Sequence, residues 1–175
     1  MNRAEREATY VDFVGARRDQ WRRIAFGMCG DWHKADDLVQ TALVKLYVAW
    51  PRVVGRGHEE AYLRKILINV AIDESRRPSR RERATDTVPE AAAPQGVSTE
   101  DRSSLVAAHQ TLPAQQRATV LLRHWLGLST RETAAELGIS EGTVKSHTSR
   151  GIAALRVQLS APGLAAGEVG VLPNP

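Results

Sequence analysis

The stretch that decides the fold of the C-terminal half is residues 130–147, TRETAAELGISEGTVKSH. Its first part predicts a short helix, which Ser129 or Thr130 can cap by accepting a backbone N–H bond with the side-chain oxygen. Gly138 predicts the end of that helix, because the left-handed backbone that closes many helices costs little only for glycine.

A second helix is predicted directly after this turn. Ser140 can cap it, Ile139 fills the corner, and Val144 points back into the core. The small side chain of Ala134 lets the two helices cross closely. These offsets are typical of a helix-turn-helix, a compact unit that lays its second helix in the major groove of DNA. A helical hairpin with no role in DNA binding is the alternative.

The outward face of the second predicted helix is polar and basic. Arg and Lys side chains hold phosphates or bond to guanine edges, and Ser hydroxyls can do either. A solvated polar face is the alternative explanation. The residues of this helix that we predict to contact DNA are Thr143, Lys145, Ser146, His147, Ser149 and Arg150.

Periodic apolar residues predict three packed helices in the N-terminal half. One has Asp31 or Asp36 as its cap, runs to about Trp50 and stops at Pro51, since proline disfavours helix in the residue before it. Another spans residues 59–77. A third helix lies upstream and packs against both. Its apolar residues are Tyr10, Phe13, Val14, Trp21, Ile24 and Ala25.

Proline, glycine and alanine are frequent between the two halves. Residues 78–102 contain almost no large apolar side chains and predict a flexible linker, because such a segment cannot bury a core. The sequence therefore predicts an all-α protein of two small domains, at residues 1–77 and 103–160. The glycine- and proline-rich residues 161–175 are predicted to be a disordered tail.

Composition and charge narrow the classes of function. The chain has 175 residues and a net charge of +4, which suits a polyanionic partner, although a mildly basic protein without one explains the charge equally well. The single cysteine, Cys29, excludes an internal disulfide and fits a reducing cytoplasm. No stretch reaches the roughly 20 apolar residues of a membrane span, and the N-terminus lacks the pattern of a secretory signal. We therefore expect a cytoplasmic protein with no membrane insertion.

The chemically reactive side chains argue against an enzyme. The five histidines are scattered, and no pair has the spacing of metal ligands on one helix. The sequence contains no glycine-rich phosphate loop and no nucleophile elbow. We expect no catalytic residues, no metal and no cofactor.

The motifs around the helix-turn-helix resemble the C-terminal domain of extracytoplasmic-function sigma factors, most closely the short actinobacterial type. The matching stretches there are residues 112–117, 120–124 and 142–147. In the N-terminal half, residues 36–42 resemble the polymerase-binding helix of that family, and residues 62–77 resemble its −10 recognition helix. The resemblance covers both halves in the right order.

This resemblance implies a sigma factor that binds core RNA polymerase, recognises the −10 and −35 promoter elements and initiates transcription of a specific gene set. Its partners would be promoter DNA, the clamp of the largest polymerase subunit, the polymerase flap and a candidate anti-sigma factor. The implied polymerase-binding residues are Asp36, Asp37, Leu38 and Gln40. The implied −10 residues are Arg56, Tyr62, Arg64, Lys65, Asn69, Asp73, Arg76 and Arg77.

Three positions depart from the family pattern. His147 stands where the family often has Arg, and Thr148 replaces a usual apolar residue. Gly151 stands where alanine is common, and a glycine inside a helix costs about 1 kcal/mol. These departures bear on the −35 preference. A free-standing helix-turn-helix regulator is the alternative function, but such proteins usually carry a receiver or ligand domain, and no βαβ pattern is visible.

Overall fold

The computed structural model describes residues 2–77 and 99–160, and all regular structure in these two ranges is helical, as expected. We call the first range the N-terminal block and the second the C-terminal block. The N-terminal block contains α1 (Arg3–Ala16), α2 (Arg18–Cys29), α3 (Trp32–Val53) and α4 (Glu59–Arg76). The C-terminal block contains α5 (Thr99–Gln110), α6 (Ala114–Val120), the π-helix η1 (Leu121–Trp125), α7 (Thr130–Leu137) and α8 (Glu141–Leu159).

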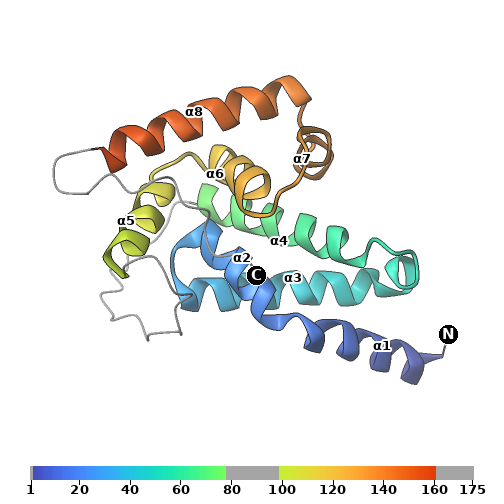
Figure 1. The fold of residues 1–175 in the computed structure, drawn as a ribbon. Coiled ribbons are helices and arrows are strands. Elements are labelled where there is room, and N and C mark those ends of the chain that lie inside the picture. The colour runs from blue at the N-terminus through green and yellow to red at the C-terminus, as the bar shows by residue number, and fades with distance from the viewer. Residues whose placement is uncertain (1, 78–98, 161–175) are drawn as a thin grey trace.

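Helices α2, α3 and α4 pack on one another and form the core of the N-terminal block (Figure 1). The largest side chains of this core are fully buried: Trp21, Ile24, Leu46, Trp50, Leu63, Leu67 and Ile68. Helix α1 lies along α3, where the Tyr10 hydroxyl donates to the Leu43 carbonyl at 2.8 Å. The apolar periodicity of the sequence therefore identified the faces that meet in this core.

The upstream helix differs from the prediction, because the chain forms two helices there and not one. Arg17 separates α1 from α2 with φ −140° and ψ 24°, outside the helical region. Tyr10 and Phe13 belong to α1, whereas Trp21 and Ile24 belong to α2. The break redirects the chain, so that α1 packs on α3 while α2 enters the core.

The structure of α3 shows which of the two candidate residues caps the helix and where the helix ends. Asp31 is the cap, because its side chain accepts a hydrogen bond from the Lys34 N–H at 2.9 Å. The predicted stop at Pro51 is wrong, since the helix continues to Val53. The extra residues are held by the Val54 N–H, which donates to the Trp50 carbonyl at 2.9 Å, and by burial of Val53.

The helix-turn-helix forms as predicted. Ser129 accepts a hydrogen bond from the Glu132 N–H at 3.1 Å, and the Glu132 carboxylate accepts one from the Ser129 N–H at 2.7 Å. Gly138 ends α7 in the left-handed conformation, with φ 65°. Ser140 caps α8, and Val144 is fully buried.

The two blocks share one hydrophobic cluster. Helices α6 and α7 of the C-terminal block contact α4 of the N-terminal block, and α5 and α6 contact α2 (Figure 1). Four buried residues of the C-terminal block join the N-terminal core: Ala118, Leu121, Leu122 and Leu128. The sequence predicted two helical units but not this packing between them.

Helix α5 begins at Thr99, inside the stretch predicted as linker. The remainder of that stretch, residues 78–98, and the predicted tail lie outside the described residues. In the part of the chain that the structure describes, no helix is long and apolar enough to cross a membrane. The same part holds no cluster of three or more His, Cys, Asp or Glu side chains that could bind a metal ion.

Candidate nucleic-acid interface

The polar face of α8 is open to solvent. Lys145, Ser149 and Arg150 are exposed, with Thr143 and Ser146 half-buried beside them. The opposite face of the helix packs against α5 and α6 through its three buried residues, which are Val144, Gly151 and Leu155. A helix held on one side by its core and carrying Lys, Ser and Arg on the other is suited to lie in a DNA groove.

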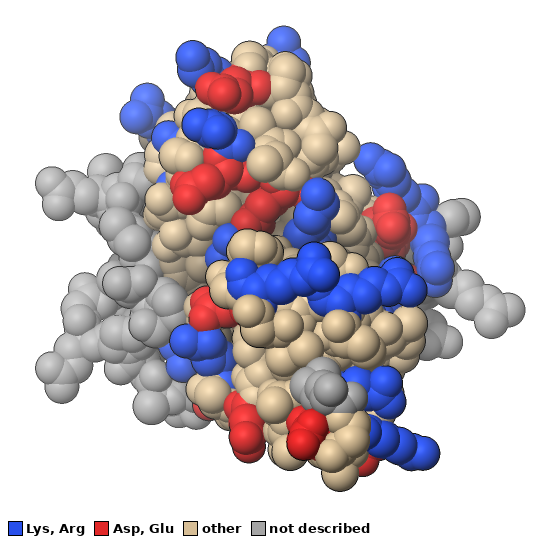
Figure 2. Space-filling model, turned by 90° about the vertical axis from the view of Figure 1, so that its right-hand side faces the viewer, with Lys and Arg blue, Asp and Glu red and all other residues tan. Residues whose placement is uncertain are grey.

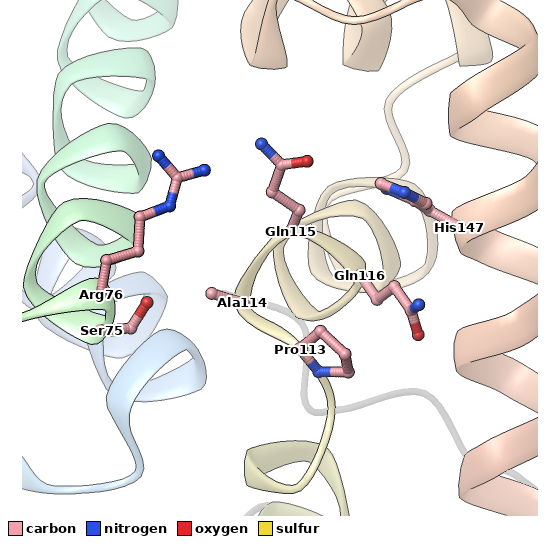
Figure 3. Close-up of a pocket in the computed structure, with 7 residues that line it drawn as sticks. All are labelled: Ser75, Arg76, Pro113, Ala114, Gln115, Gln116 and His147. Carbon is pink, nitrogen blue, oxygen red and sulfur yellow. The ribbon is translucent and has the colours of Figure 1, made fainter.

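His147 does not belong to this open face. It is half-buried and lines a cleft of about 420 Å³ between α4, the start of α6 and α8. Figure 3 shows Arg76 on α4 and His147 on α8, with the first residues of α6 between them. The other lining residues are Ser75, Pro113, Ala114, Gln115 and Gln116. His147 lines this cleft, whereas Lys145 and Arg150 do not.

The candidate −10 residues of α4 fall on two different faces. Tyr62, Lys65, Asn69 and Asp73 are exposed and follow the spacing i, i+3, i+7, i+11, which places them on one side of the helix. Arg64 is half-buried and forms an ion pair with Glu136 of α7. Arg76 lines the cleft described above.

The loop before α4 positions Arg56. Gly55 and Gly57 flank this exposed residue with φ values of 77° and 74°, which side chains other than glycine rarely adopt. The Glu59 carboxylate accepts hydrogen bonds from the Arg56 N–H at 3.1 Å and the Gly57 N–H at 3.4 Å. Hydrogen bonds from its own N–H and from these loop N–H groups lower the pKa of Glu59. At the far end of α4, exposed Arg77 pairs with Glu74 at 3.4 Å.

The candidate polymerase-binding residues of α3 differ in how exposed they are. Asp37 and Gln40 are exposed, whereas Leu38 is only 6% exposed and lies in the core. Asp36 pairs with Arg22, and this hydrogen bond lowers the pKa of the carboxyl group. The structure therefore removes Leu38 from the accessible surface of α3.

Two exposed valines on α3 were missed by the sequence analysis. Val44 is 66% exposed and Val48 is 75% exposed. Positions 37, 40, 44 and 48 follow helical spacing, so these valines extend the face of Asp37 and Gln40. The signal that could have found them is an apolar pair on the otherwise polar side of an amphipathic helix.

Positive side chains gather at one end of the molecule. Figure 2 shows the side on which α7, the α3–α4 loop and the start of α1 lie, and Lys and Arg form a band across it. Acidic side chains lie on both sides of this band. A local band of positive charge attracts a phosphate backbone more strongly than the net charge alone would suggest.

Comparison with known proteins gives consistent matches over both blocks. The family models Sigma-70 region 2 and Sigma-70, region 4 match residues 13–81 and 102–155. The chain is 37% identical to an RNA polymerase sigma-E factor of Streptomyces avermitilis, over 89% of this chain and 87% of the relative. It is 34% identical to the ECF RNA polymerase sigma factor SigL of Mycobacterium tuberculosis, over 81% and 84%.

A solved structure shows the same fold. The sigma factor RpoE, in complex with the anti-sigma factor NepR from Bartonella quintana, matches with a TM-score of 0.69 and 26% identity. The match covers 87% of this chain and 99% of that chain, so it includes helices of both blocks.

Proposed function

The chain belongs to the extracytoplasmic-function group of sigma-70-type RNA polymerase sigma factors, and from this premise we propose which of its surfaces meet the polymerase and the promoter. As a sigma factor it directs transcription initiation. The observation that carries the proposal is the open basic face of α8, held in place by the capped helix-turn-helix. Because that face is turned away from the core on which α8 packs, it is available to a DNA groove.

The −35 element is bound by α8 in this proposal. Lys145, Ser149 and Arg150 supply the central contacts, with Thr143 and Ser146 at the edge of the same face. Arg can bond to guanine with two parallel hydrogen bonds, whereas Lys and Ser can hold phosphates. His147 is left out of this set, because its side chain is half-buried in the cleft.

The −10 element is bound by the exposed face of α4 and the loop before it. Exposed Tyr62 offers a ring on which an unpaired base can stack. Lys65 offers a cation for a phosphate, and Asn69 a donor and acceptor for a base edge. Arg56 and Arg77 extend this surface at the two ends of α4.

Core polymerase is bound by the outer face of α3, through Asp37, Gln40, Val44 and Val48. A face that carries one exposed carboxylate and two exposed apolar side chains suits a partner helix with basic and apolar residues. A cytoplasmic location follows from these partners, and the proposal assigns the chain no catalytic residue. The solved relative bound to an anti-sigma factor supports a partner of that class for this chain as well.

In vitro transcription with core polymerase on a genomic promoter library tests the proposal. Arg150→Ala should cost about 1–3 kcal/mol at one position of the −35 element if the side chain contacts a base pair, while core binding stays unchanged. Arg156→Ala, also exposed on α8 but in its last turn, is the matched control. Equal responses of wild-type and −35-mutant promoters to Arg150→Ala would reject the assignment.

A free-standing helix-turn-helix regulator is the alternative function. It predicts DNA binding by α8 without any affinity of the N-terminal block for polymerase. The match of the N-terminal block to the sigma-70 region 2 model supports the sigma-factor proposal instead. Recovery of core polymerase subunits with the tagged full chain separates the two, because only a sigma factor retains them.

A further inference from the structure

The cleft where α4, α6 and α8 meet has no part in the proposed function. It holds about 420 Å³ and is lined by the end of α4, the start of α6 and His147 of α8. Sites for small molecules span roughly 300–1,000 Å³, so the volume of this cleft suits a small ligand. The DNA-binding surfaces proposed above include neither Arg76 nor His147, and both line the cleft. A recess whose polar side chains serve no other purpose in the proposal is a candidate binding site.

The charge of the cleft favours an anion. Its seven lining residues include one Arg and one His but no Asp or Glu. The next residue of the chain, Arg77, is engaged by Glu74 at 3.4 Å. Among the described residues, by contrast, no carboxylate lies within ion-pair distance of Arg76. The N–H donors of the Arg76 guanidinium are therefore available to a negatively charged ligand.

An amide donor lies on the same wall. Figure 3 shows the side chains of Arg76 and Gln115 extending in the same direction, one from the end of α4 and the other from the start of α6. The Gln115 backbone carbonyl accepts a hydrogen bond from the Thr119 Oγ1 at 2.7 Å, but among the described residues the side-chain amide has no partner. A guanidinium fork beside an amide N–H suits the oxygens of a phosphate group.

The opposite wall carries His147. Its ring points from α8 toward the first turn of α6 (Figure 3). The Nδ1 is buried and has no hydrogen-bond partner among the described residues, so the Nε2 is the ring nitrogen that remains for a ligand. An imidazole nitrogen can donate to a hydroxyl group or accept from one. This wall therefore suits an uncharged polar group.

The residues between the two walls are apolar or already bonded. Pro113 and Ala114 line the middle of the cleft and offer carbon surface. The Ser75 hydroxyl donates to the Ile72 carbonyl at 2.6 Å, so its proton is not available to a ligand. The part of a ligand that crosses this middle region should be its carbon skeleton.

We propose that this cleft binds the phosphate monoester of a small hydroxylated molecule, the class that includes sugar phosphates and nucleoside monophosphates. Arg76 and Gln115 hold the phosphate group. The carbon skeleton lies on Pro113 and Ala114, and a hydroxyl group of the ligand meets His147. The inference goes beyond the proposed function, because the surfaces assigned there to DNA and polymerase use none of these five residues.

The arrangement of charges favours a small ester over a DNA strand. A strand presents a row of phosphates, and proteins match it with several Lys or Arg side chains. The cleft offers one Arg, and its far wall offers a histidine and no second Arg. Free phosphate would fill only the wall of Arg76 and leave the rest of the cleft without contacts.

Isothermal titration calorimetry on the full chain tests the proposal, with adenosine monophosphate and glycerol phosphate as probes. Both should bind with a dissociation constant of about 1 mM or below, because charge-assisted bonds to the phosphate supply most of the affinity. Adenosine lacks the phosphate group and should bind at least about tenfold more weakly than its monophosphate. Inorganic phosphate lacks the carbon skeleton and should also bind more weakly than either ester.

Variants at the two walls locate the binding. Arg76→Gln should weaken binding of both esters about tenfold, since it removes the charged donor. Arg77→Gln is the matched control, because it removes the same charge one residue away and outside the cleft. His147→Ala should weaken binding of adenosine monophosphate about fivefold and leave binding of inorganic phosphate unchanged. His124→Ala, at an exposed histidine outside the cleft, should change neither.

Four outcomes would overturn the proposal. The first is that neither ester binds the wild-type chain. The second is that Arg76→Gln binds the esters as tightly as the wild type, or no more weakly than Arg77→Gln, since the site would then lie outside the cleft. The third is that inorganic phosphate binds as tightly as the esters. The fourth is that a labelled DNA single strand displaces adenosine monophosphate and loses affinity in His147→Ala, which would assign the cleft to DNA.

Discussion

The two blocks differ in how far each forms a core from its own residues. In the N-terminal block, α2, α3 and α4 supply a large cluster that includes Trp21, Trp50 and Leu67. The separate cluster of the C-terminal block has four buried members, which are Ala108, Leu112, Val120 and Leu155. Three further buried leucines of that block, Leu121, Leu122 and Leu128, belong to the N-terminal cluster instead. The N-terminal block is thus built to fold on its own residues, whereas the C-terminal block completes its burial by docking.

This difference sets the free-energy cost of separating the two blocks. Burying one leucine side chain contributes about 1.5–3 kcal/mol, and Leu121 and Leu122 are both fully buried against the other block. Separating the blocks therefore costs several kcal/mol unless new contacts cover the exposed surface. Binding to polymerase and promoter is the process that can offset this cost.

The largest effect is expected from Leu121→Ala, which removes a side chain shared by the two cores. The cavity should lower the free energy of unfolding by about 2–5 kcal/mol. Hydrogen exchange followed by mass spectrometry should show faster exchange in α2 and α4 as well as in the C-terminal block. Leu155→Ala removes a leucine from the separate cluster, and its faster exchange should stay within the C-terminal block. Identical exchange patterns for the two variants would refute the division of the cores.

Acid should weaken the docking through His109. Burial, and secondly the charge of Arg117, lower the pKa of His109 to about 4, from an ordinary value of 6.5. Because the pKa is lowered in the docked state, the stabilisation is fully present above pH 6.5 and is lost as the pH falls toward 4. The loss should reach about 2.5 kcal/mol at pH 4.5, taking 1.36 kcal/mol per pH unit. Its imidazole Nε2 is buried without a hydrogen-bond partner among the described residues, so a proton there gains no new bond.

Urea unfolding between pH 7 and pH 4.5 measures this effect. His109→Gln should flatten the pH dependence relative to the wild type, since the carboxylates that titrate in the same range are common to both proteins. His124 provides a comparison, because it is less deeply buried and burial lowers its pKa less. A wild-type curve parallel to that of His109→Gln would show that His109 does not link docking to pH.

The helix-turn-helix could be predicted because each of its signals is local. Ser129, Gly138 and Ser140 act on the backbone within four residues of themselves, and the structure confirms all three. The docking of the blocks could not be predicted in this way. Ile68 and Ile72 form a second apolar stripe on α4, and periodicity alone does not tell which element covers such a stripe.

Two errors of the sequence analysis have the same origin. Leu38 was assigned to the polymerase surface because it lies in a matching motif, yet its position on the apolar face of α3 places it in the core. Gly151 was treated as a departure that weakens α8. In the structure, a Cβ there would lie 2.6 Å from the Val120 Cγ2, so the glycine permits the close crossing of α8 and α6. Both corrections depend on packing partners distant in sequence.

Gly151→Ala sharpens the comparison within the C-terminal cluster. Alanine gains about 1 kcal/mol of helix propensity over glycine, but the clash with Val120 should cost about 1–3 kcal/mol. We expect a net loss of stability of about 1 kcal/mol, measured by thermal unfolding. Gly142→Ala is the control, because its Cβ would have only an ordinary contact at 3.7 Å with the Ser140 hydroxyl. That variant should be neutral or slightly stabilised, and stabilisation of both variants would show that the crossing can relax.

The smallest effects on stability are expected on the outer face of α3, which lies in the block that supplies its own core. Asp36→Ala breaks the pair with Arg22, but both side chains are more than a third exposed, so the loss should stay below about 1 kcal/mol. Asp37→Ala and Val48→Ser should change stability by less than about 0.5 kcal/mol, since neither side chain is buried.

If this face binds polymerase, Asp37→Ala and Val48→Ser should nevertheless weaken core binding, whereas Arg156→Ala on α8 should not. Titration of labelled full-length chain with core polymerase measures the binding, and hydrogen exchange of α5–α8 should match the wild type in all of these variants. Faster exchange in the C-terminal block would mean that changes on α3 reach the shared cluster. The core of the N-terminal block would then not be independent of the C-terminal block.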